Sequence, residues 1–386
     1  MANNNENKIL NVPNLRFPEF TEEWSSQPLT DFMNFKNGLN PDAKRFGRGT
    51  KFISVMDILN NQYICYDNIR ASVELQDVDI ETYGVDYGDI LFQRSSETLE
   101  DVGRANVYLD SKPAIFGGFV IRGKSKGNYN PLFFRYLLAS PTARKRIIVK
   151  GAGAQHFNIG QDGLSKVSLD IPRLSEQEKI GKLLQCVDAR IATQNKIIEK
   201  YESLIKGIAQ HCIKESISGI TYVKLGDICQ ISTGKLDANA QVDNGIYPFF
   251  TCAEQPFKID NFAFDTEALL ISGNGANLGY INYYKGKFNA YQRTYVLDLF
   301  SENIQYIKWA LKVLLPKRIA IEKSSSNTPY IVLSTLTDLR LPIPNKSNQC
   351  HIAKLMQSLE RKLSSQIALN GSYNKLKQYL LRQMFI

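Results

Sequence analysis

The feature that most constrains this chain is a junction of strand, proline and helix that occurs twice. The segment "LDIPRLSEQEKIGKLL", residues 169–184, is followed at a constant offset of 172 by "LPIPNKSNQCHIAKLM", residues 341–356. A chance match would not keep one register over so many positions, so the chain is internally duplicated and must fold as two related halves. Identical residues at this offset include Leu169/Leu341, Ile171/Ile343, Pro172/Pro344, Ser175/Ser347, Gln177/Gln349, Ile180/Ile352, Gln194/Gln366, Tyr201/Tyr373 and Leu204/Leu376.

A second match lies near the start of each half, at an offset of 196. There "PLTDFMNFKNGL" from Pro28 corresponds to "KLGDICQISTGK" from Lys224. Because the offset falls from 196 to 172 along the chain, the first half carries roughly two dozen extra residues in its middle.

After each repeated proline the apolar residues adopt a sustained 4,3 spacing, which predicts a long helix with a coiled-coil seam. Ser175 with Glu178 predicts a capping box at the first helix start, and Ser347 holds the equivalent place in the second. Each helix is expected to run about 40 residues, or about 60 Å. Their shared register favours pairing with each other. The seam positions are Ile180, Leu184, Val187, Ile191, Gln194, Ile198 and Tyr201 in the first helix, and Ile352, Met356, Leu359, Leu363, Gln366, Tyr373 and Leu380 in the second.

The regions between the helices contain short β-branched or aromatic runs bounded by Gly, Asn or Asp, which predict strands and turns. Examples are "TKFISVMDI", "GDILFQRSS", "FGGFVIRG", "EALLISGNG" and "TYVLDLF". Two shorter helices are predicted over Pro131–Ala139 and Ile304–Leu315. We therefore divide the chain into an N-terminal tail (1–19), a first α/β domain (20–173), a central helix (174–215), a second α/β domain (216–345) and a C-terminal helix (346–386).

Composition sets limits on the function. The formal net charge of +9 and the pI near 9.0 are compatible with binding a polyanion such as DNA. Six cysteines without a Cys-x-x-Cys pair and three histidines argue against a disulfide framework or a zinc site. The longest apolar runs are too short to cross a membrane, and the start "MANNNENK" lacks the apolar segment of a signal peptide. A cytoplasmic protein without membrane contact is the expectation.

Several short segments resemble catalytic motifs without meeting their requirements. "SGNGANLG" follows a strand as a dinucleotide or S-adenosylmethionine loop would, but its glycines are wrongly spaced and "YINYYKGKF" after it does not predict a helix. "NPLF" at Asn130 lacks the second proline of the amino-methyltransferase motif and opens a predicted helix. "PDAK" at Pro41 lacks a second carboxylate on a neighbouring strand, as metal-dependent nucleases require. "STGKL" at Ser232 lacks the first glycine and the final Ser/Thr of a P-loop. We predict no catalytic centre, metal site or cofactor site in this chain.

Loop segments of both halves instead combine arginine, lysine, glutamine and asparagine with aromatic residues. Arginine can bond guanine through two donors and Gln or Asn can bond adenine, whereas Lys and Ser more often hold phosphates. The best candidates for base contacts are Arg94, Gln155, Gln292 and Arg293. The full set of candidate DNA-binding residues is Gln93, Arg94, Ser95, Arg104, Asn106, Lys150, Gln155, His156, Asn158, Asn274, Asn277, Tyr280, Gln292, Arg293, Lys323, Ser325, Asn327 and Tyr330.

With these features the chain resembles the specificity subunits of type I restriction-modification systems. The resemblance rests on the opening "LRFPEF" with Trp24, the Leu-x-Asp start of each half, and the doubled "IP…S…Q…I…KL" junctions, in that order. It implies an α+β fold in which two duplicated α/β target recognition domains are separated by two long antiparallel coiled-coil helices. Each domain would read one half of a bipartite, asymmetric DNA target.

The resemblance also implies partners. Two methyltransferase (M) subunits would dock on the helices and restriction (R) subunits would join the complex on double-stranded DNA. S-adenosylmethionine, ATP and Mg would then be bound by the partner subunits. Two other classes stay open, namely a self-contained DNA methyltransferase or nuclease, and a coiled-coil scaffold that joins two protein-binding modules.

Overall fold

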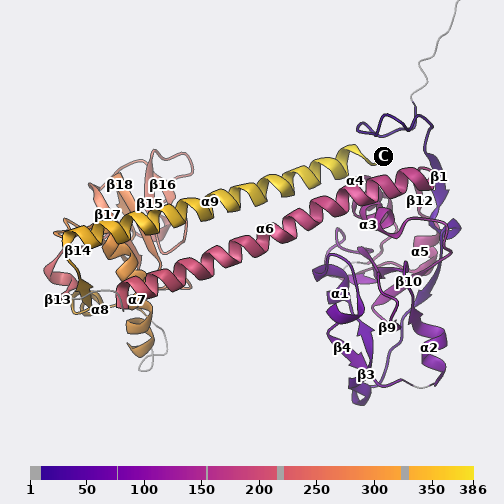
Figure 1. Ribbon diagram of the computed structural model, residues 1–386, viewed down its shortest axis with the longest axis horizontal. Coiled ribbons are helices and arrows are strands. Elements are labelled where there is room, and N and C mark those ends of the chain that lie inside the picture. Colours follow the sequence, from indigo (N-terminus) through magenta and orange to yellow (C-terminus); the bar gives the residue numbers. More distant parts are fainter. Residues whose placement is uncertain (1–9, 76, 154, 215–220, 323–329) are drawn as a thin grey trace, which may run out of the picture. The chain divides into compact units, whose positions relative to one another are not determined.

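The computed structural model describes residues 10–75, 77–153, 155–214, 221–322 and 330–386. The chain divides into two compact units, unit 1 formed by residues 1–195 with 369–386 and unit 2 by residues 196–368. Two long helices, α6 (Leu174–Lys214) and α9 (Lys346–Gln383), each contribute to both units (Figure 1). No helix in the described part of the chain has both the length and the hydropathy of a membrane span.

Unit 1 contains two four-stranded sheets. The first has the order β2-β10-β6-β8 and the second β4-β3-β9-β5, while β1 pairs with β12 and β7 with β11. The strands are β1 (Ser25–Pro28), β2 (Met33–Asn37), β3 (Phe46–Ile53), β4 (Ala71–Val73), β5 (Gly84–Val85), β6 (Ile90–Gln93), β7 (Ser95–Ser96), β8 (Ala105–Val107), β9 (Ala114–Phe116), β10 (Val120–Ser125), β11 (Phe157–Asn158) and β12 (Ser168–Ile171). The helices are η1 (Leu29–Asp31), η2 (Ala43–Arg45), α1 (Val55–Asn60), η3 (Tyr66–Asn68), α2 (Asp77–Tyr83), α3 (Pro131–Ala139), α4 (Pro141–Ile148) and α5 (Gln161–Ser165).

Unit 2 contains one six-stranded sheet of order β14-β19-β17-β18-β15-β16, and a separate pair of β13 with β20. Its strands are β13 (Thr221–Lys224), β14 (Gln230–Thr233), β15 (Tyr247–Phe250), β16 (Phe257–Ile259), β17 (Phe264–Ser272), β18 (Ile281–Ala290), β19 (Thr294–Asp298) and β20 (Arg340–Ile343). Its shorter helices are η4 (Leu225–Asp227), η5 (Ala238–Ala240), α7 (Ile304–Glu322) and α8 (Leu333–Thr337).

The duplication predicted from the sequence appears as repeated strand pairing. The strand before each junction pairs antiparallel with the first strand of its own domain, as β1–β12 and as β13–β20. The triplet β2-β10-β6 of unit 1 recurs as β14-β19-β17 in unit 2. The parallel pair β3–β9 recurs as β15–β18. The two halves therefore share one core topology, and the predicted mixed fold with two related domains is confirmed.

A buried glutamine holds each long helix to its own domain. Gln177 of α6 accepts a hydrogen bond from the backbone N–H of Asn130 at 2.9 Å and donates one to the Pro172 carbonyl at 2.9 Å. Gln349 of α9 makes the same two bonds, with Asn303 and Pro344, both at 2.9 Å. Asn130 and Asn303 in turn accept hydrogen bonds from the first N–H groups of α3 and α7. The repeated junction is thus a repeated buried contact.

An acidic side chain strengthens each of these attachments three turns further along the helix. Asp188 of α6 is buried and contacts Arg135 at 3.1 Å, the Tyr136 hydroxyl at 2.8 Å and Lys377 at 2.6 Å. Glu360 occupies the equivalent place in α9 and contacts Lys308 at 2.8 Å and Lys312 at 3.2 Å. Since Asp188 and Glu360 are 172 residues apart, this second contact is also duplicated.

The two long helices pack against each other within each unit. In unit 1, Ile180, Leu184 and Val187 near the start of α6 share a core with Leu380 and Met384 near the end of α9. In unit 2, the end of α6 packs on the start of α9 through a cluster that includes Ile205, Ala209, Met356, Leu359 and Leu363. Both contacts require antiparallel helices. All predicted seam positions are buried or half-buried, including the polar Gln194 and Gln366.

Three local predictions are wrong or incomplete. Each helix begins one residue before its predicted capping serine, and Asn345, not Ser347, caps α9 by accepting a hydrogen bond from the Asn348 N–H at 2.9 Å. The helix predicted to end at Leu315 continues as α7 through Pro316 to Glu322. The cause lies upstream of the proline, where Leu311 and Leu315 are fully buried and hold the helix in the core. Finally, the second half of "TKFISVMDI" is helix α1 and not strand.

Candidate nucleic-acid interface

The candidate residues of the first half meet where β6 and β10 adjoin. The pairing of β7 with β11 places Ser95 opposite Asn158, and the two side chains are hydrogen-bonded. Arg94 extends from the end of β6, and its guanidinium donates to the Gly118 carbonyl at 3.4 Å. Gln155, His156 and Asn158 are exposed, and exposed Phe119 lies in the loop before β10. Arg94, Ser95, Phe119 and residues 155–158 form what we call the unit 1 reading surface.

Unit 2 builds a corresponding surface from corresponding loops. The Arg94 N–H donates to the Phe119 carbonyl at 2.9 Å, and the Gly273 N–H donates to the Arg293 carbonyl at 2.8 Å. Ile159 donates to the Arg94 carbonyl, and Ile331 donates to the Gly273 carbonyl, both at 2.9 Å. Arg293 thus corresponds to Phe119, and Tyr330 to Asn158. We call Asn274, Tyr280, Gln292, Arg293 and Tyr330 the unit 2 reading surface.

Two glycines define the same turn in both units. Gly103 has a φ of 68° and Gly279 a φ of 81°, and each donates its N–H to the residue that ends the neighbouring central strand, Gln93 or Ser272. A residue with a Cβ is disfavoured at such angles. The turns place Arg104 and Tyr280 in equivalent positions, and both side chains are exposed. Candidate residues from separate parts of each half are therefore brought together at one edge of each sheet.

The structure removes two residues from the candidate set. Asn106 is 3% exposed, and its amide donates to the Ile58 and Asn61 carbonyls at 3.1 and 2.8 Å, so it fixes α1 against β8 and cannot contact DNA. Gln93 is 5% exposed and donates to the Ser95 carbonyl at 2.9 Å, so it supports the turn below the surface. Successive side chains of a strand point to opposite faces of the sheet, so a strand residue beside an exposed loop can still point into the core. This is why the sequence wrongly placed both residues on the surface. Lys323, Ser325 and Asn327 lie outside the described residues.

Cys252 is a residue of this site that sequence reasoning missed. Its thiol donates to the Asn274 side-chain oxygen at 3.0 Å and lies 3.7 Å from the Arg293 carbonyl, while its own carbonyl accepts from the Asn277 amide at 3.0 Å. Three loops of the unit 2 surface are therefore held by one half-buried cysteine. Asn274 and Asn277, which we proposed as DNA contacts, have these supporting roles in the free protein. A lone cysteine between two strand-like runs gives no sequence signal for such a role.

Unit 1 contains a pocket of about 550 Å³ that is lined among others by Arg104, Arg135, Arg144, Lys145 and Lys377. Arg144 donates to the Glu100 and Val102 carbonyls at 2.9 and 2.6 Å. Burial, together with the positive charge of Arg104, lowers the pKa of Arg144 to about 10. The Arg144 guanidinium remains charged at neutral pH, so it adds positive potential to this pocket.

Among the residues that the structure describes, no group of three or more His, Cys, Asp or Glu side chains converges. "SGNGANLG" connects β17 to its antiparallel neighbour β18, as expected from the strand-like sequence that follows it. A dinucleotide loop instead leads from a strand into a helix whose N-terminus holds the phosphates.

Comparison with known proteins gives one family. A model described as "Type I restriction modification DNA specificity domain" matches residues 21–203 and 217–370, one segment in each half. The specificity subunit of the type I restriction enzyme EcoDI from Escherichia coli is 43% identical over 143 residues, which cover 37% of this chain and 32% of that protein. The chain thus matches about a third of the length of this relative.

Two solved structures share the fold. The S subunit of a type I restriction-modification system from M. genitalium has a TM-score of 0.63 at 17% identity, covering 97% of this chain and 99% of that one. A chain from a study of complex assembly and conformational transition of the type I R-M system has a TM-score of 0.61 at 14% identity, covering 93% and 96%. At these identities the likeness concerns the fold.

Proposed function

Because this chain belongs to the family of type I restriction-modification DNA specificity proteins, we propose that it is the non-catalytic subunit that selects the DNA sequence for such a complex. Each unit reads one half of a bipartite target through its reading surface. The halves differ in sequence, so the two half-sites differ and the target is asymmetric.

The observation that carries this proposal is the equivalence of the two reading surfaces. Both are built from the ends of the same two strands, and both present side chains able to bond base edges or phosphates. The residues at equivalent places differ, as Phe119 and Arg293 do. One fold that holds different side chains in the same loops is suited to reading two different base sequences.

The partners follow from the same reasoning. Double-stranded DNA, two methyltransferase subunits and restriction subunits are the proposed partners, and the complex acts in the cytoplasm. S-adenosylmethionine, ATP and Mg belong to the partner subunits. The long helices are the proposed docking surface for the methyltransferase subunits, because part of each lies outside the seam and exposes apolar side chains such as Leu204 and Leu376, 50% and 44% exposed.

Methylation by purified components tests this function. We expect methyl transfer to adenines in DNA only when this chain and the methyltransferase subunit are both present, and only at one bipartite sequence. A methyltransferase that modified the same sequence without this chain would exclude the proposed role. Methyl transfer by the purified chain alone would instead show that it is itself an enzyme.

A further inference from the structure

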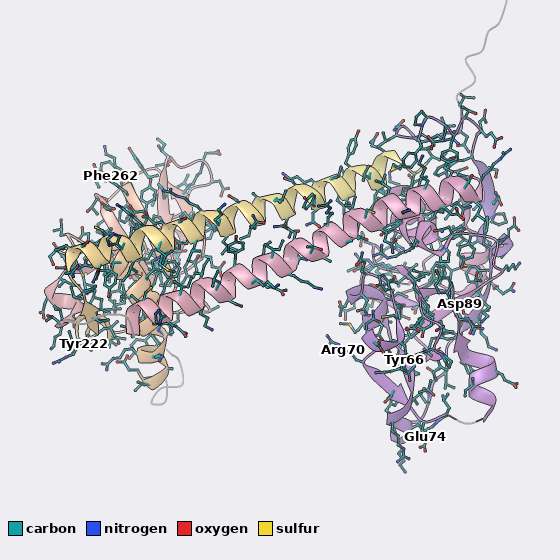
Figure 2. The ribbon with its side chains drawn as sticks, in the orientation of Figure 1. Tyr66, Arg70, Glu74, Asp89, Tyr222 and Phe262 are labelled. Carbon is teal, nitrogen blue, oxygen red and sulfur yellow. The ribbon has the colours of Figure 1, made fainter. Side chains whose placement is uncertain are left out.

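The turn between β9 and β10 presents an exposed phenylalanine within the unit 1 reading surface. It comprises Gly117, Gly118, Phe119 and Val120, and a hydrogen bond from the Val120 N–H to the Gly117 carbonyl closes it at 2.8 Å. Phe119 is 68% exposed, whereas the other three residues of the turn are buried. In Figure 2, Asp89 marks the beginning of β6, and the turn lies beside the other end of that strand, where β10 begins.

The backbone of this turn is fixed on several sides. The Gly117 N–H donates to a carbonyl of β3 at 3.0 Å, and the Phe119 carbonyl accepts from the Arg94 N–H at 2.9 Å. Asn40 packs so closely on Gly118 that a Cβ there would lie 1.8 Å from the Asn40 side-chain oxygen. These contacts fix the direction of the Phe119 side chain before any partner binds, so the binding of a partner has to order only the ring.

Unit 2 forms the same turn from residues 291–294. The N–H of its last residue, Thr294, donates to the Tyr291 carbonyl at 2.8 Å, and the Tyr291 N–H donates to a carbonyl of β15 at 2.9 Å. Both bonds repeat those of the unit 1 turn. The two central residues of the unit 2 turn are Gln292 and Arg293, whose side chains can bond base edges.

The unit 1 turn has a different chemistry at these two places. Its central residues are Gly118 and Phe119. Glycine has no side chain, and a phenyl ring has no hydrogen-bond donor or acceptor, so the side chains of this turn cannot bond base edges as those of unit 2 can. An exposed apolar ring suits the C5-methyl group of thymine, which is the apolar group that a T·A pair presents in the major groove.

We infer that Phe119 selects a T·A base pair in the half-site that unit 1 reads, through contact of its ring with the thymine C5-methyl group. This inference rests on the proposed function and adds the chemistry of one contact to it. The contact removes the apolar surface of the ring and of the methyl group from water, which favours thymine over the other bases. The two half-sites are thus read by different chemistry at equivalent places of the two units.

The test replaces each thymine of the recognised target in turn, on either strand, by deoxyuridine, which lacks only the C5-methyl group. Duplex affinity is measured for this chain assembled with its methyltransferase subunits. We expect the wild-type complex to lose roughly fourfold in affinity when the thymine that contacts Phe119 is replaced, since this is the effect of exposing one group of about the size of a methylene.

Three variants show whether Phe119 causes this loss. Phe119→Ala should bind the thymine and uracil duplexes equally at that position. Phe119→Leu keeps an apolar side chain and should retain a preference for thymine. The matched control is Tyr87→Ala, which removes a side chain that is 61% exposed and lies near the beginning of β6, outside the reading surface. It should keep the wild-type preference.

A wild-type complex that bound every uracil duplex as tightly as the thymine duplex would overturn the inference. A Phe119→Ala complex that kept the wild-type preference for thymine would also overturn it, whatever its affinity, because the ring would then not contact the methyl group. If the wild-type complex bound its target no more tightly than a scrambled duplex, the proposed function itself would fail.

Discussion

At the scale of single residues, the proposed function needs some side chains that read bases and others that hold phosphates. Arg94 and Arg293 lie on the two reading surfaces, each with an exposed or half-exposed guanidinium. We expect Arg94→Ala to reduce discrimination at one position of one half-site by about 1–3 kcal/mol, and Arg293→Ala to do so in the other half-site. The measurement is binding to duplexes that differ by one base pair.

Lys150→Ala serves as the comparison for these variants. A phosphate contact at Lys150 would weaken binding to all sequences alike and reduce the salt dependence. Gln155 and Gln292 belong to the same set of predicted base contacts. If alanine at all four of these Arg and Gln positions left affinity and sequence preference unchanged, the reading surfaces would be wrongly placed.

The buried junction glutamines give a stability prediction. Gln177→Ala leaves the Asn130 N–H and the Pro172 carbonyl without their partner, and an unsatisfied buried polar group costs about 1–3 kcal/mol. Gln349→Ala should cost a similar amount in unit 2. The measurement is the free energy of unfolding in urea, with the exposed Gln185→Ala as a control. An effect no larger than that of the control would show that these bonds do not hold the helices.

The buried carboxylate Asp188 gives a prediction about pH. Burial alone would raise the pKa of Asp188, but hydrogen bonds and charges from Lys377, Arg135 and Tyr136 outweigh it, so the pKa lies below its usual value. A lowered pKa contributes stability that is complete above the unfolded value of about 3.9 and is lost as the pH falls through the folded value.

Asp188→Asn should therefore be less stable than the wild type at pH 7, by about 3–5 kcal/mol because Arg135 and Lys377 lose their buried partner. The difference should stay constant down to about pH 5 and then shrink in more acid solution. Urea unfolding at several pH values measures it. A difference that grew on acidification would contradict this electrostatic interpretation.

At the scale of elements, the long helices are the proposed ruler between the half-sites. Inserting four residues near Gln194 lengthens α6 by about 6 Å, which corresponds to roughly two base-pair steps of 3.4 Å. Four residues are slightly more than one helical turn, so the insertion also changes the phase of the heptad. If the partner helix slips in response, the shift between the half-sites can fall to about one base-pair step. We expect the number of unspecified bases between the half-sites to change, while the bases of each half-site stay the same. An active variant with the original spacing would show that these helices do not set the distance.

The sequence was most informative where a pattern extends over many residues. The helices α6 and α9 follow from their heptad spacing and the shared offset, and α3 follows from Asn130-Pro131 at its start. The sequence pattern gave a wrong prediction where packing in the core determines the end of an element. The helix predicted to end at Leu315 continues past Pro316 as α7, because Leu311 and Leu315 are buried in the core. The reading surfaces were predicted as loops, but their assembly depends on long-range contacts such as Arg94 with Gly118, which no local pattern contains.

At the scale of the whole molecule, duplication makes the two units separately exchangeable. Each unit has its own core and its own attachment to a long helix, through Gln177 and Asp188 or through Gln349 and Glu360. Replacing residues 20–173 by the matching domain of a relative should alter one half-site and keep the other. A hybrid that changed both half-sites would show that the units do not read independently.

The most direct test of the central claim is a genome-wide map of methylated adenines in cells with and without this chain. We expect methylation at one bipartite, asymmetric sequence in cells that contain it, and the loss of methylation at that sequence when the chain alone is deleted. Restoring the chain should restore the same sequence. Methylation that persisted at the same sites after the deletion would contradict the claim that this chain selects them.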